Sequence, residues 1–189
     1  MRDGYERILV LVIDGLRPDA QQTVDYFRQH GKTVVLLSGD EAALARQVGD
    51  QLGIETTVGG YLPADKLNFV QQLQRRGCVV AMVGDGINDA AVLGAADVSF
   101  AMGGGAALAQ AHADAVLLNG RLSAVADSAR IAARTMQVIR QNLCWATVYN
   151  VAAIPAAAFG LLNPWLSGVG MAFSSAVVVL NALRLRKGL

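Results

Sequence analysis

The chain has little charge and little cysteine, and both shortages exclude classes of protein. Of its 189 residues, 16% are charged and only two are cysteines. Cys78 and Cys144 lie in separate apolar runs, which is not the spacing of a disulfide framework. The net charge of +1 is not typical of a nucleic-acid-binding protein, so we expect no nucleic-acid partner.

Charge is absent altogether from two long stretches in the last third of the chain. Residues 142–162 and 164–183 contain no Asp, Glu, Lys or Arg, and each is about long enough to cross a bilayer as a helix. Basic residues flank the pair on both sides: Arg130, Arg134, Arg140, Arg184, Arg186 and Lys187. Because positive flanks stay in the cytoplasm, we expect a two-helix transmembrane hairpin with both termini cytoplasmic and membrane lipid as a partner. Two buried core helices are the alternative, but a chain of this size surrounds them poorly.

The most specific pattern is the string MVGDGINDAA at residues 82–91. It follows the apolar run 78–83, which is typical of a buried strand. Its turn carries two glycines, two carboxylates and an amide: Gly84, Gly86, Asp85, Asp89 and Asn88. Glycines allow a ligand to approach the backbone closely, and Mg²⁺ is usually held by one or two carboxylates plus a phosphate. The string predicts a magnesium and phosphate site, with an ordinary Asp-Gly turn and helix cap as the alternative.

Two further segments carry candidate phosphate ligands. The apolar run 33–37 ends in Ser38, Gly39 and Asp40, which places a hydroxyl and backbone amides at a strand end where α/β sheets bind ligands; alternatively, Asp40 caps the following helix. Lys66 falls in the first turn of a helix that begins at Pro63. A positive charge is unfavourable there, which suggests another task, although a solvated surface lysine is the simpler reading.

The order of apolar and polar segments predicts the fold class. Short β-type runs at residues 8–13, 33–37, 55–58, 78–83 and 97–101 alternate with helical segments. This alternation predicts an α/β fold with a doubly wound parallel sheet and right-handed crossovers. We expect an α/β domain over residues 1–120, a helical connector over 121–141 and the hairpin over 142–189.

In their order along the chain, these motifs resemble the P-type ATPases, whose phosphorylation domain is haloacid-dehalogenase-like. The matching strings are SGD at 38–40, the lysine of PADK at 63–66 and GDGINDAAVL at 84–93. The resemblance implies that Asp85 and Asp89 organise Mg²⁺ and that Asn88 hydrogen-bonds nearby. It also implies that Ser38, with Gly39 and Asp40, binds phosphate and that Lys66 neutralises the phosphoryl group. ATP would be the substrate of the parent pump.

The hairpin resembles the last two membrane helices of heavy-metal P-type ATPases of the copper-transporting group. Tyr149 and Asn150 match their YN motif, and residues 171–175 match MxxSS. The resemblance implies that Tyr149, Asn150, Met171 and Ser175 help to form the path of the transported Cu(I). A thioether suits this soft ion, but ordinary helix packing through small residues is the alternative. Silver as the ion, and export or delivery as the direction, stay open.

Parts that P-type ATPases need do not occur in this sequence. They are the phosphorylated DKTGT motif, the TGE motif of the actuator, a nucleotide-binding domain and a membrane cysteine-proline motif. The resemblance therefore implies the carboxyl-terminal portion of a pump in a bacterial inner membrane. We expect this portion to be inactive by itself and to need a chain that carries the missing parts.

Two other functions stay open. Asp14 ends the strand expected at residues 8–13, so it could be the nucleophile of a membrane-anchored phosphatase. Such enzymes usually carry a second Asp two positions later, where this chain has Leu16. The other alternative is a non-enzymatic, membrane-anchored module that binds phosphate compounds or assembles with another chain.

Overall fold

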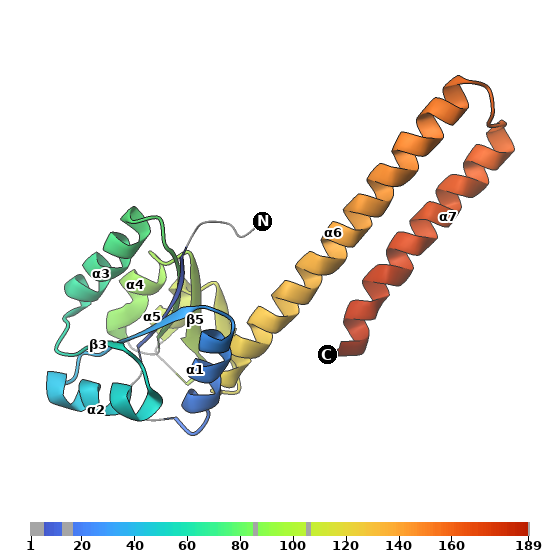
Figure 1. Ribbon diagram of the computed structural model, residues 1–189. Coiled ribbons are helices and arrows are strands. Elements are labelled where there is room, and N and C mark those ends of the chain that lie inside the picture. Colours follow the sequence, from blue (N-terminus) through green and yellow to red (C-terminus); the bar gives the residue numbers. More distant parts are fainter. Residues whose placement is uncertain (1–5, 13–16, 85–86, 105–106, 189) are drawn as a thin grey trace. The chain divides into compact units, whose positions relative to one another are not determined.

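The computed structural model describes residues 6–12, 17–84, 87–104 and 107–188. The chain divides into two compact units, Met1–Asp127 and Ser128–Leu189. The first unit contains the α/β part of the sequence, and the second contains the helical hairpin (Figure 1).

A six-stranded parallel sheet forms the centre of the first unit. Its strands are β1 (Arg7–Leu11), β2 (Thr33–Leu37), β3 (Thr56–Val58), β4 (Val79–Gly84), β5 (Val98–Met102) and β6 (Ala115–Leu117). They lie in the order β3-β2-β1-β4-β5-β6, with neighbours parallel throughout, as in the pairing of Leu9 with Val34 and Ala81. The chain moves outward from β1 in one direction and from β4 in the other. The boundary between β1 and β4 is therefore the switch point at which sheets of this type bind ligands.

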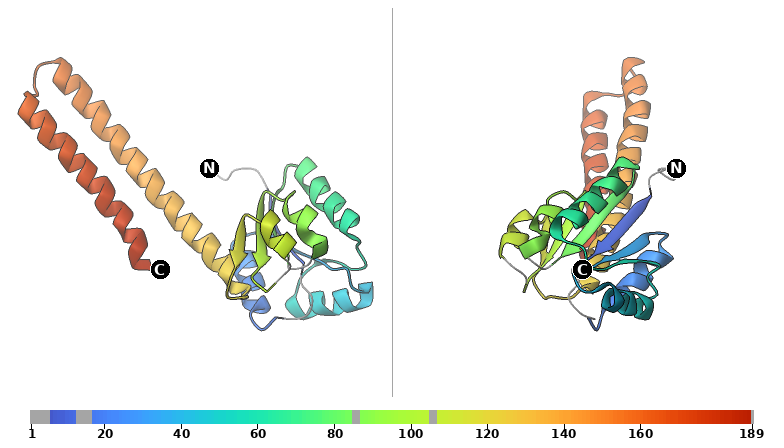
Figure 2. Two further views of the ribbon diagram at one scale, coloured as in Figure 1. Left: turned by 180° about the vertical axis from the view of Figure 1, so that it is seen from behind. Right: turned by 90° about the vertical axis from the view of Figure 1, so that its left-hand side faces the viewer.

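Helices cover both faces of the sheet, which explains why the strands are apolar on both sides. They are α1 (Ala20–Gln29), α2 (Ala42–Leu52), α3 (Pro63–Arg75), α4 (Ala90–Leu93) and α5 (Ala107–His112), with a 3₁₀ turn η1 (Ile87–Asp89) before α4. The helices α3, α4 and α5 lie on one face and α1 and α2 on the other (Figures 1 and 2). On the first face, Ile8 and Val10 of β1 share a core with Val70 of α3 and Leu93 of α4.

The structure confirms the doubly wound parallel sheet that the sequence predicts. Each of the five expected strands is present with ends shifted by at most two residues among those described; Ile13 lies outside the described residues. The strand β6 was not expected, because three residues are too few to show a pattern. The expected cap by Asp40 is wrong: the N-cap of α2 is Glu41, and its side chain makes no capping hydrogen bond.

The second unit is a pair of antiparallel helices. They are α6 (Ser123–Ala158), whose first turn belongs to the first unit, and α7 (Pro164–Leu183), followed by a 3₁₀ turn η2 (Arg184–Gly188). The two helices lie side by side in every view (Figures 1 and 2). The start of α7 is fixed by Asn163, whose side-chain oxygen accepts hydrogen bonds from the backbone N–H groups of Trp165 (2.8 Å) and Leu166 (3.2 Å). Pro164 follows at the first helical position, which suits its missing N–H.

Within the described residues, one helical segment is long and apolar enough to cross a membrane, Trp165–Arg186. It coincides with the second expected span. The first expected span, residues 142–162, does not meet the same criterion, and its helix ends at Ala158. The polar residues Asn142, Tyr149 and Asn150 and the helical Pro155 lower the hydropathy of this stretch.

Candidate functional site

Three neighbouring strands end at the switch point of the sheet. Ser38 directly follows β2, Val12 follows β1, and Gly84 ends β4. The backbone N–H of Val12 donates to the carbonyl of Val83 at 2.9 Å, which extends the β1–β4 pairing by one residue. Parallel strands bring these ends to one edge, so residues separated by up to 72 positions lie together there.

The hydroxyl of Ser38 is buried and held in a fixed orientation. It donates to Asp40 Oδ2 at 3.0 Å and accepts from the backbone N–H of Asp40 at 3.0 Å. The backbone N–H of Ser38 donates to the carbonyl of Val58 at 2.8 Å. Asp40 therefore serves this turn rather than the helix that follows it, and Gly39 lies between the two, exposed.

Lys66 and Asp89 form a buried ion pair at the same edge. The distance from Lys66 Nζ to Asp89 Oδ1 is 2.9 Å, and the two side chains are only 7% and 4% exposed. Lys66 lies in the first turn of α3, which starts with Pro63 and is stabilised by Asp65, whose carboxylate accepts from the backbone N–H of Leu62 at 3.1 Å. The simpler reading of Lys66 as a solvated surface residue is therefore wrong.

Gly84 lies against Asp89. A Cβ atom at position 84 would be 3.1 Å from Asp89 Cβ and 3.3 Å from its Oδ2, which leaves little room for a larger residue. Asn88, one residue earlier than Asp89, is exposed. Asp85 and Gly86, the other expected members of this turn, lie outside the described residues.

Magnesium suits the donors at this edge. Asp89 supplies a hard carboxylate with one oxygen paired to Lys66, and Mg²⁺ sites in proteins commonly combine one or two carboxylates with a phosphate. Among the described residues, no three His, Cys, Asp or Glu side chains cluster as a metal cage. Asp89 is thus a single hard ligand, of the kind that Mg²⁺ combines with phosphate oxygens.

The four residues expected in the ion path are only partly brought together in the helix pair. Tyr149 of α6 packs against Gly170 of α7, where an added Cβ would lie 2.9 Å from its hydroxyl oxygen. Asn150 is exposed and donates to the carbonyl of Ala146 in its own helix at 2.9 Å. Met171 and Ser175 are one turn apart on α7, and both are exposed.

Two side-chain contacts were not expected from the sequence. Trp145 Nε1 donates to the hydroxyl of Ser174 at 3.2 Å and links the two helices. In the first unit, the backbone N–H of Ser123 donates to Asp19 Oδ2 at 2.7 Å, so that a carboxylate 104 positions earlier caps α6. Burial by itself would raise the pKa of Asp19, but the hydrogen bonds from Ser123 and the charge of Arg17 outweigh it and lower this pKa. A serine at a helix start is a sequence signal for a cap, but it does not identify the distant partner.

The strand order defines a doubly wound α/β protein, and folds of this class bind ligands at the carboxyl ends of their strands. The buried Lys66–Asp89 pair lies at that edge. The chain belongs to the haloacid dehalogenase-like hydrolase family, whose model matches residues 3–97.

Comparisons over the whole chain confirm the resemblance to heavy-metal P-type ATPases. The chain is 42% identical over 181 residues to a probable copper-importing P-type ATPase A of Enterococcus hirae. This alignment covers 95% of this chain and 25% of that protein. It is 42% identical over 185 residues to a copper-exporting P-type ATPase of Bacillus subtilis, covering 98% of this chain and 23% of that protein. A crystal structure of a zinc-transporting PIB-type ATPase matches with a TM-score of 0.84 and 34% identity, over 91% of this chain and 28% of that one. The chain thus spans about a quarter of the length of these relatives.

Proposed function

We propose that this chain is the part of a copper-type P-type ATPase that contains most of the phosphorylation domain and the last two membrane helices. The parent reaction would couple ATP hydrolysis to the movement of Cu(I) across a membrane. The single observation that carries the proposal is the buried Lys66–Asp89 pair, in a chain that is similar to copper pumps over 95% or more of its length.

In this proposal the residues at the carboxyl ends of the strands act together on a phosphorylated carboxylate of the pump. Ser38 and the amides of Gly39 and Asp40 bind phosphate oxygens, and Lys66 neutralises their charge. Asp85 and Asp89 hold Mg²⁺, which would polarise the phosphoryl group when bound. Asn88 forms a hydrogen bond nearby, and Gly84 and Gly86 allow the phosphate to approach the backbone closely. The short Lys66–Asp89 distance supports the assignment, because a buried cation and a buried carboxylate lie together at this edge.

The division of labour along the chain is part of the proposal. Residues 1–120 would form part of the phosphorylation domain. Residues 121–141 would form a connector, and residues 142–189 a hairpin with two spans and both termini in the cytoplasm, in a bacterial inner membrane. The candidate span Trp165–Arg186 supports the second crossing. The absence of charged residues from 142–162 and the basic flanks on both sides support the first.

Cu(I) as the transported ion is supported by the chemistry of the helix pair. Residues 142–183 hold no charged side chain, whereas a divalent zinc ion favours carboxylates or imidazoles in addition to thiolates. Tyr149, Asn150, Met171 and Ser175 would line the ion path, with the Met171 thioether as the soft ligand. In the parent, further helices would cover Met171 and Ser175, which are exposed in this pair.

A segment exchange tests the proposal. Residues 1–189 replace the matching quarter of the Bacillus subtilis copper-exporting ATPase, and the chimera is assayed for copper tolerance in a copper-sensitive strain and for metal-stimulated ATPase activity in membranes. We expect the exchange to retain activity with Cu(I), because the segment would then receive the phosphorylated motif and the nucleotide-binding domain that it lacks.

Matched variants of the chimera make the test specific. Lys66→Met and Asp89→Asn should abolish the activity, while Lys32→Met and Asp50→Asn, which change the same residue types away from the site, should not. A chimera that is stimulated by Zn²⁺ but not by Cu(I) would contradict the assignment of the ion. A well-folded chimera without any metal-stimulated hydrolysis would contradict the proposal as a whole.

The strand order supports one second candidate, a phosphatase that acts without a partner chain. β1 lies at the centre of the sheet between β2 and β4. Val12, which follows β1, therefore lies between the ends of β2 and β4, which are marked by Ser38 and Gly84. Asp14 follows two residues later and lies outside the described residues. Phosphatase activity of the purified 189-residue chain with Mg²⁺, lost in Asp14→Asn, would favour this enzyme. Binding of phosphate compounds without turnover would favour the non-enzymatic module instead.

A further inference from the structure

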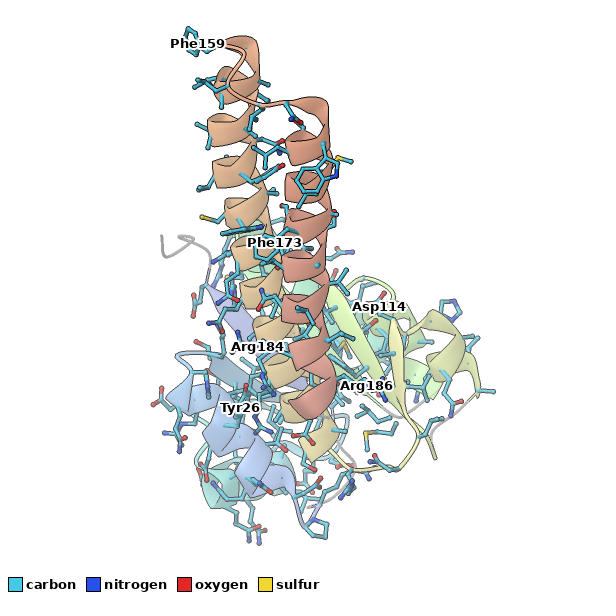
Figure 3. The ribbon with its side chains drawn as sticks, turned by 90° about the vertical axis from the view of Figure 1, so that its right-hand side faces the viewer. Tyr26, Asp114, Phe159, Phe173, Arg184 and Arg186 are labelled. Atoms are coloured by element: carbon cyan, nitrogen blue, oxygen red, sulfur yellow. The ribbon has the colours of Figure 1, made fainter. Side chains whose placement is uncertain are left out.

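The charges of the helix pair are all of one sign. The unit Ser128–Leu189 contains no Asp and no Glu, and its basic residues are Arg130, Arg134, Arg140, Arg184, Arg186 and Lys187. These lie in the first half of α6 and after the end of α7, which is one end of an antiparallel pair. Figure 3 shows Arg184 and Arg186 at this end and Phe159 at the other. The unit therefore attracts anions at a single end.

A pocket of about 80 Å³ lies between the two helices at this basic end. Its lining residues are Arg134, Gln137, Val138, Gln141, Arg184 and Leu185. The four residues from α6 follow the spacing i, i+3, i+4 and i+7, so they share one face of the helix. A pocket of this volume holds a few water molecules, which is room for a phosphate group but not for a nucleotide.

The pocket presents more hydrogen-bond donors than acceptors. Arg134 has no hydrogen-bond or ion-pair partner within the part of the chain that the structure describes. Gln141 Oε1 accepts from Asn181 Nδ2 at 3.2 Å, which occupies its oxygen and leaves its NH₂ group for another acceptor. Arg184 gives one N–H to Asn181 Oδ1 at 3.2 Å and retains the others. Arginine forks of this kind bind phosphate oxygens in a bidentate manner.

Apolar surface adjoins these donors on the side toward the middle of the helices. Leu180, one helical turn before Arg184, is 64% exposed, and Leu183 is 50% exposed. On α6, Ile139 and Leu143 are also exposed. Ile139 lies between the pocket residues Val138 and Gln141, and Leu143 lies two residues after Gln141. A ligand that fills the pocket therefore meets a cationic group at one end and hydrocarbon at the other, which is the pattern of a phospholipid.

We propose that this pocket binds the headgroup phosphate of an anionic phospholipid, with its acyl chains against the exposed leucines of α7. Basic pockets between membrane helices commonly bind such headgroups, and each Lys or Arg near an anionic surface adds to the attraction. The site is separate from the phosphate site of the first unit. It requires only that the helix pair lies in a bilayer, so it stands or falls independently of copper transport and ATP hydrolysis.

The test measures lipid binding to the full 189-residue chain in detergent by native mass spectrometry, with phosphatidylglycerol and phosphatidylcholine as probes. The pocket variant is Arg134→Gln with Arg184→Gln. The control is Arg140→Gln with Arg186→Gln, which removes the same number of positive charges from the same end of the helix pair but changes no residue that lines the pocket. Circular dichroism confirms that both variants keep their helices.

We expect the chain to bind phosphatidylglycerol more tightly than phosphatidylcholine, and the pocket variant to lose roughly tenfold more affinity than the control variant. Equal losses in the two variants would show attraction by diffuse charge and would overturn the proposal. Equal binding of the two lipids would also overturn it. Inorganic phosphate added at the lipid concentration should leave the bound phosphatidylglycerol in place; complete displacement would assign the pocket to free phosphate instead.

Discussion

At the residue scale, the most consequential feature is a pair of opposite charges placed almost out of contact with water. Lys66 and Asp89 are 23 positions apart and meet at 2.9 Å. Removing two ions from water costs several kcal/mol, and only a close partner offsets that cost. A pair of this kind contributes little net stability.

The first prediction concerns the loss of one partner of this pair. Lys66→Met leaves the Asp89 carboxylate buried without a counter-ion and should destabilise the first unit by about 3–5 kcal/mol. The measurement is hydrogen exchange at the β4 amides of the full chain. Lys32→Met, which changes a partly exposed lysine, is the control.

A double variant distinguishes the pair from simple packing. Lys66→Met with Asp89→Leu removes both charges and should be more stable than Lys66→Met alone, because no unpaired ion is left. A double variant that is less stable than the single one would contradict a buried ion pair.

At the element scale, two contacts hold the long helix α6, one at its first turn and one in its second half. The Asp19 carboxylate caps its first turn through the Ser123 N–H at 2.7 Å. Much later in the helix, Tyr149 packs against Gly170 of α7. Both contacts join segments distant in sequence, so both are properties of the assembled fold.

The second prediction concerns pH. Because the folded state lowers the pKa of Asp19 from 3.8, its stabilisation of α6 is fully present above the ordinary pKa and is lost as the pH falls through the folded value. Asp19→Asn should weaken protection of the first turn of α6 by about 1 kcal/mol at pH 6 and remove most of its change between pH 4 and pH 3. Hydrogen exchange corrected for intrinsic rates measures this protection. Asp50→Asn, at an exposed position, should behave as the wild type, and an unchanged pH profile in Asp19→Asn would refute the cap.

The third prediction compares two glycines of α7. Gly170→Ala places a Cβ 2.9 Å from the Tyr149 hydroxyl oxygen, whereas Gly168→Ala meets nothing within 4 Å. The first change should destabilise the helix pair by about 1–3 kcal/mol through overpacking. The second should stabilise α7 by up to about 1 kcal/mol, since alanine favours helix more than glycine does. Unfolding of the full chain in mixed micelles, followed by tryptophan fluorescence, measures both; two changes of the same sign would contradict the contact.

At the scale of the whole molecule, the first turn of α6 belongs to the core of the first unit although the rest of the helix belongs to the second. Leu122 and Val125 are buried with Ala126, and the first compact unit extends to Asp127. Because these apolar side chains complete the core, the α/β unit depends on residues that also begin the helix toward the hairpin.

The fourth prediction is a comparison of two truncations. A chain that ends at residue 127 should fold and give a cooperative thermal transition by circular dichroism. A chain that ends at residue 120 loses the buried Leu122 and Val125 and should be less stable by about 3–6 kcal/mol, at about 1.5–3 kcal/mol for each buried side chain. Equal stability of the two chains would show that the first domain folds fully within residues 1–120 and does not need the first turn of α6.

Most of the fold could be predicted from the sequence because its signals are local. The apolar runs before Ser38 and Gly84 gave strands within one residue of those observed, since buried parallel strands are continuously apolar. Residues 115–117 gave no signal, because a three-residue edge strand depends on its neighbour β5. The first expected membrane span, residues 142–162, stays a prediction, because the described helices contain one sufficiently apolar segment, Trp165–Arg186.

The sequence by itself determined the alternation of strands and helices, the apolar hairpin with basic ends and the identity of the candidate phosphate ligands, because each depends on residues close together in the chain. Only the tertiary structure decided that Lys66 is buried against Asp89, that Asp40 holds Ser38 rather than α2, and that Asp19 caps α6. The physical reason is that burial and hydrogen-bond partners are set by which elements pack together. Strand order and helix packing determine that Asp89 meets a partner 23 positions away and Asp19 a partner 104 positions away. The local pattern of residues does not predict either partner.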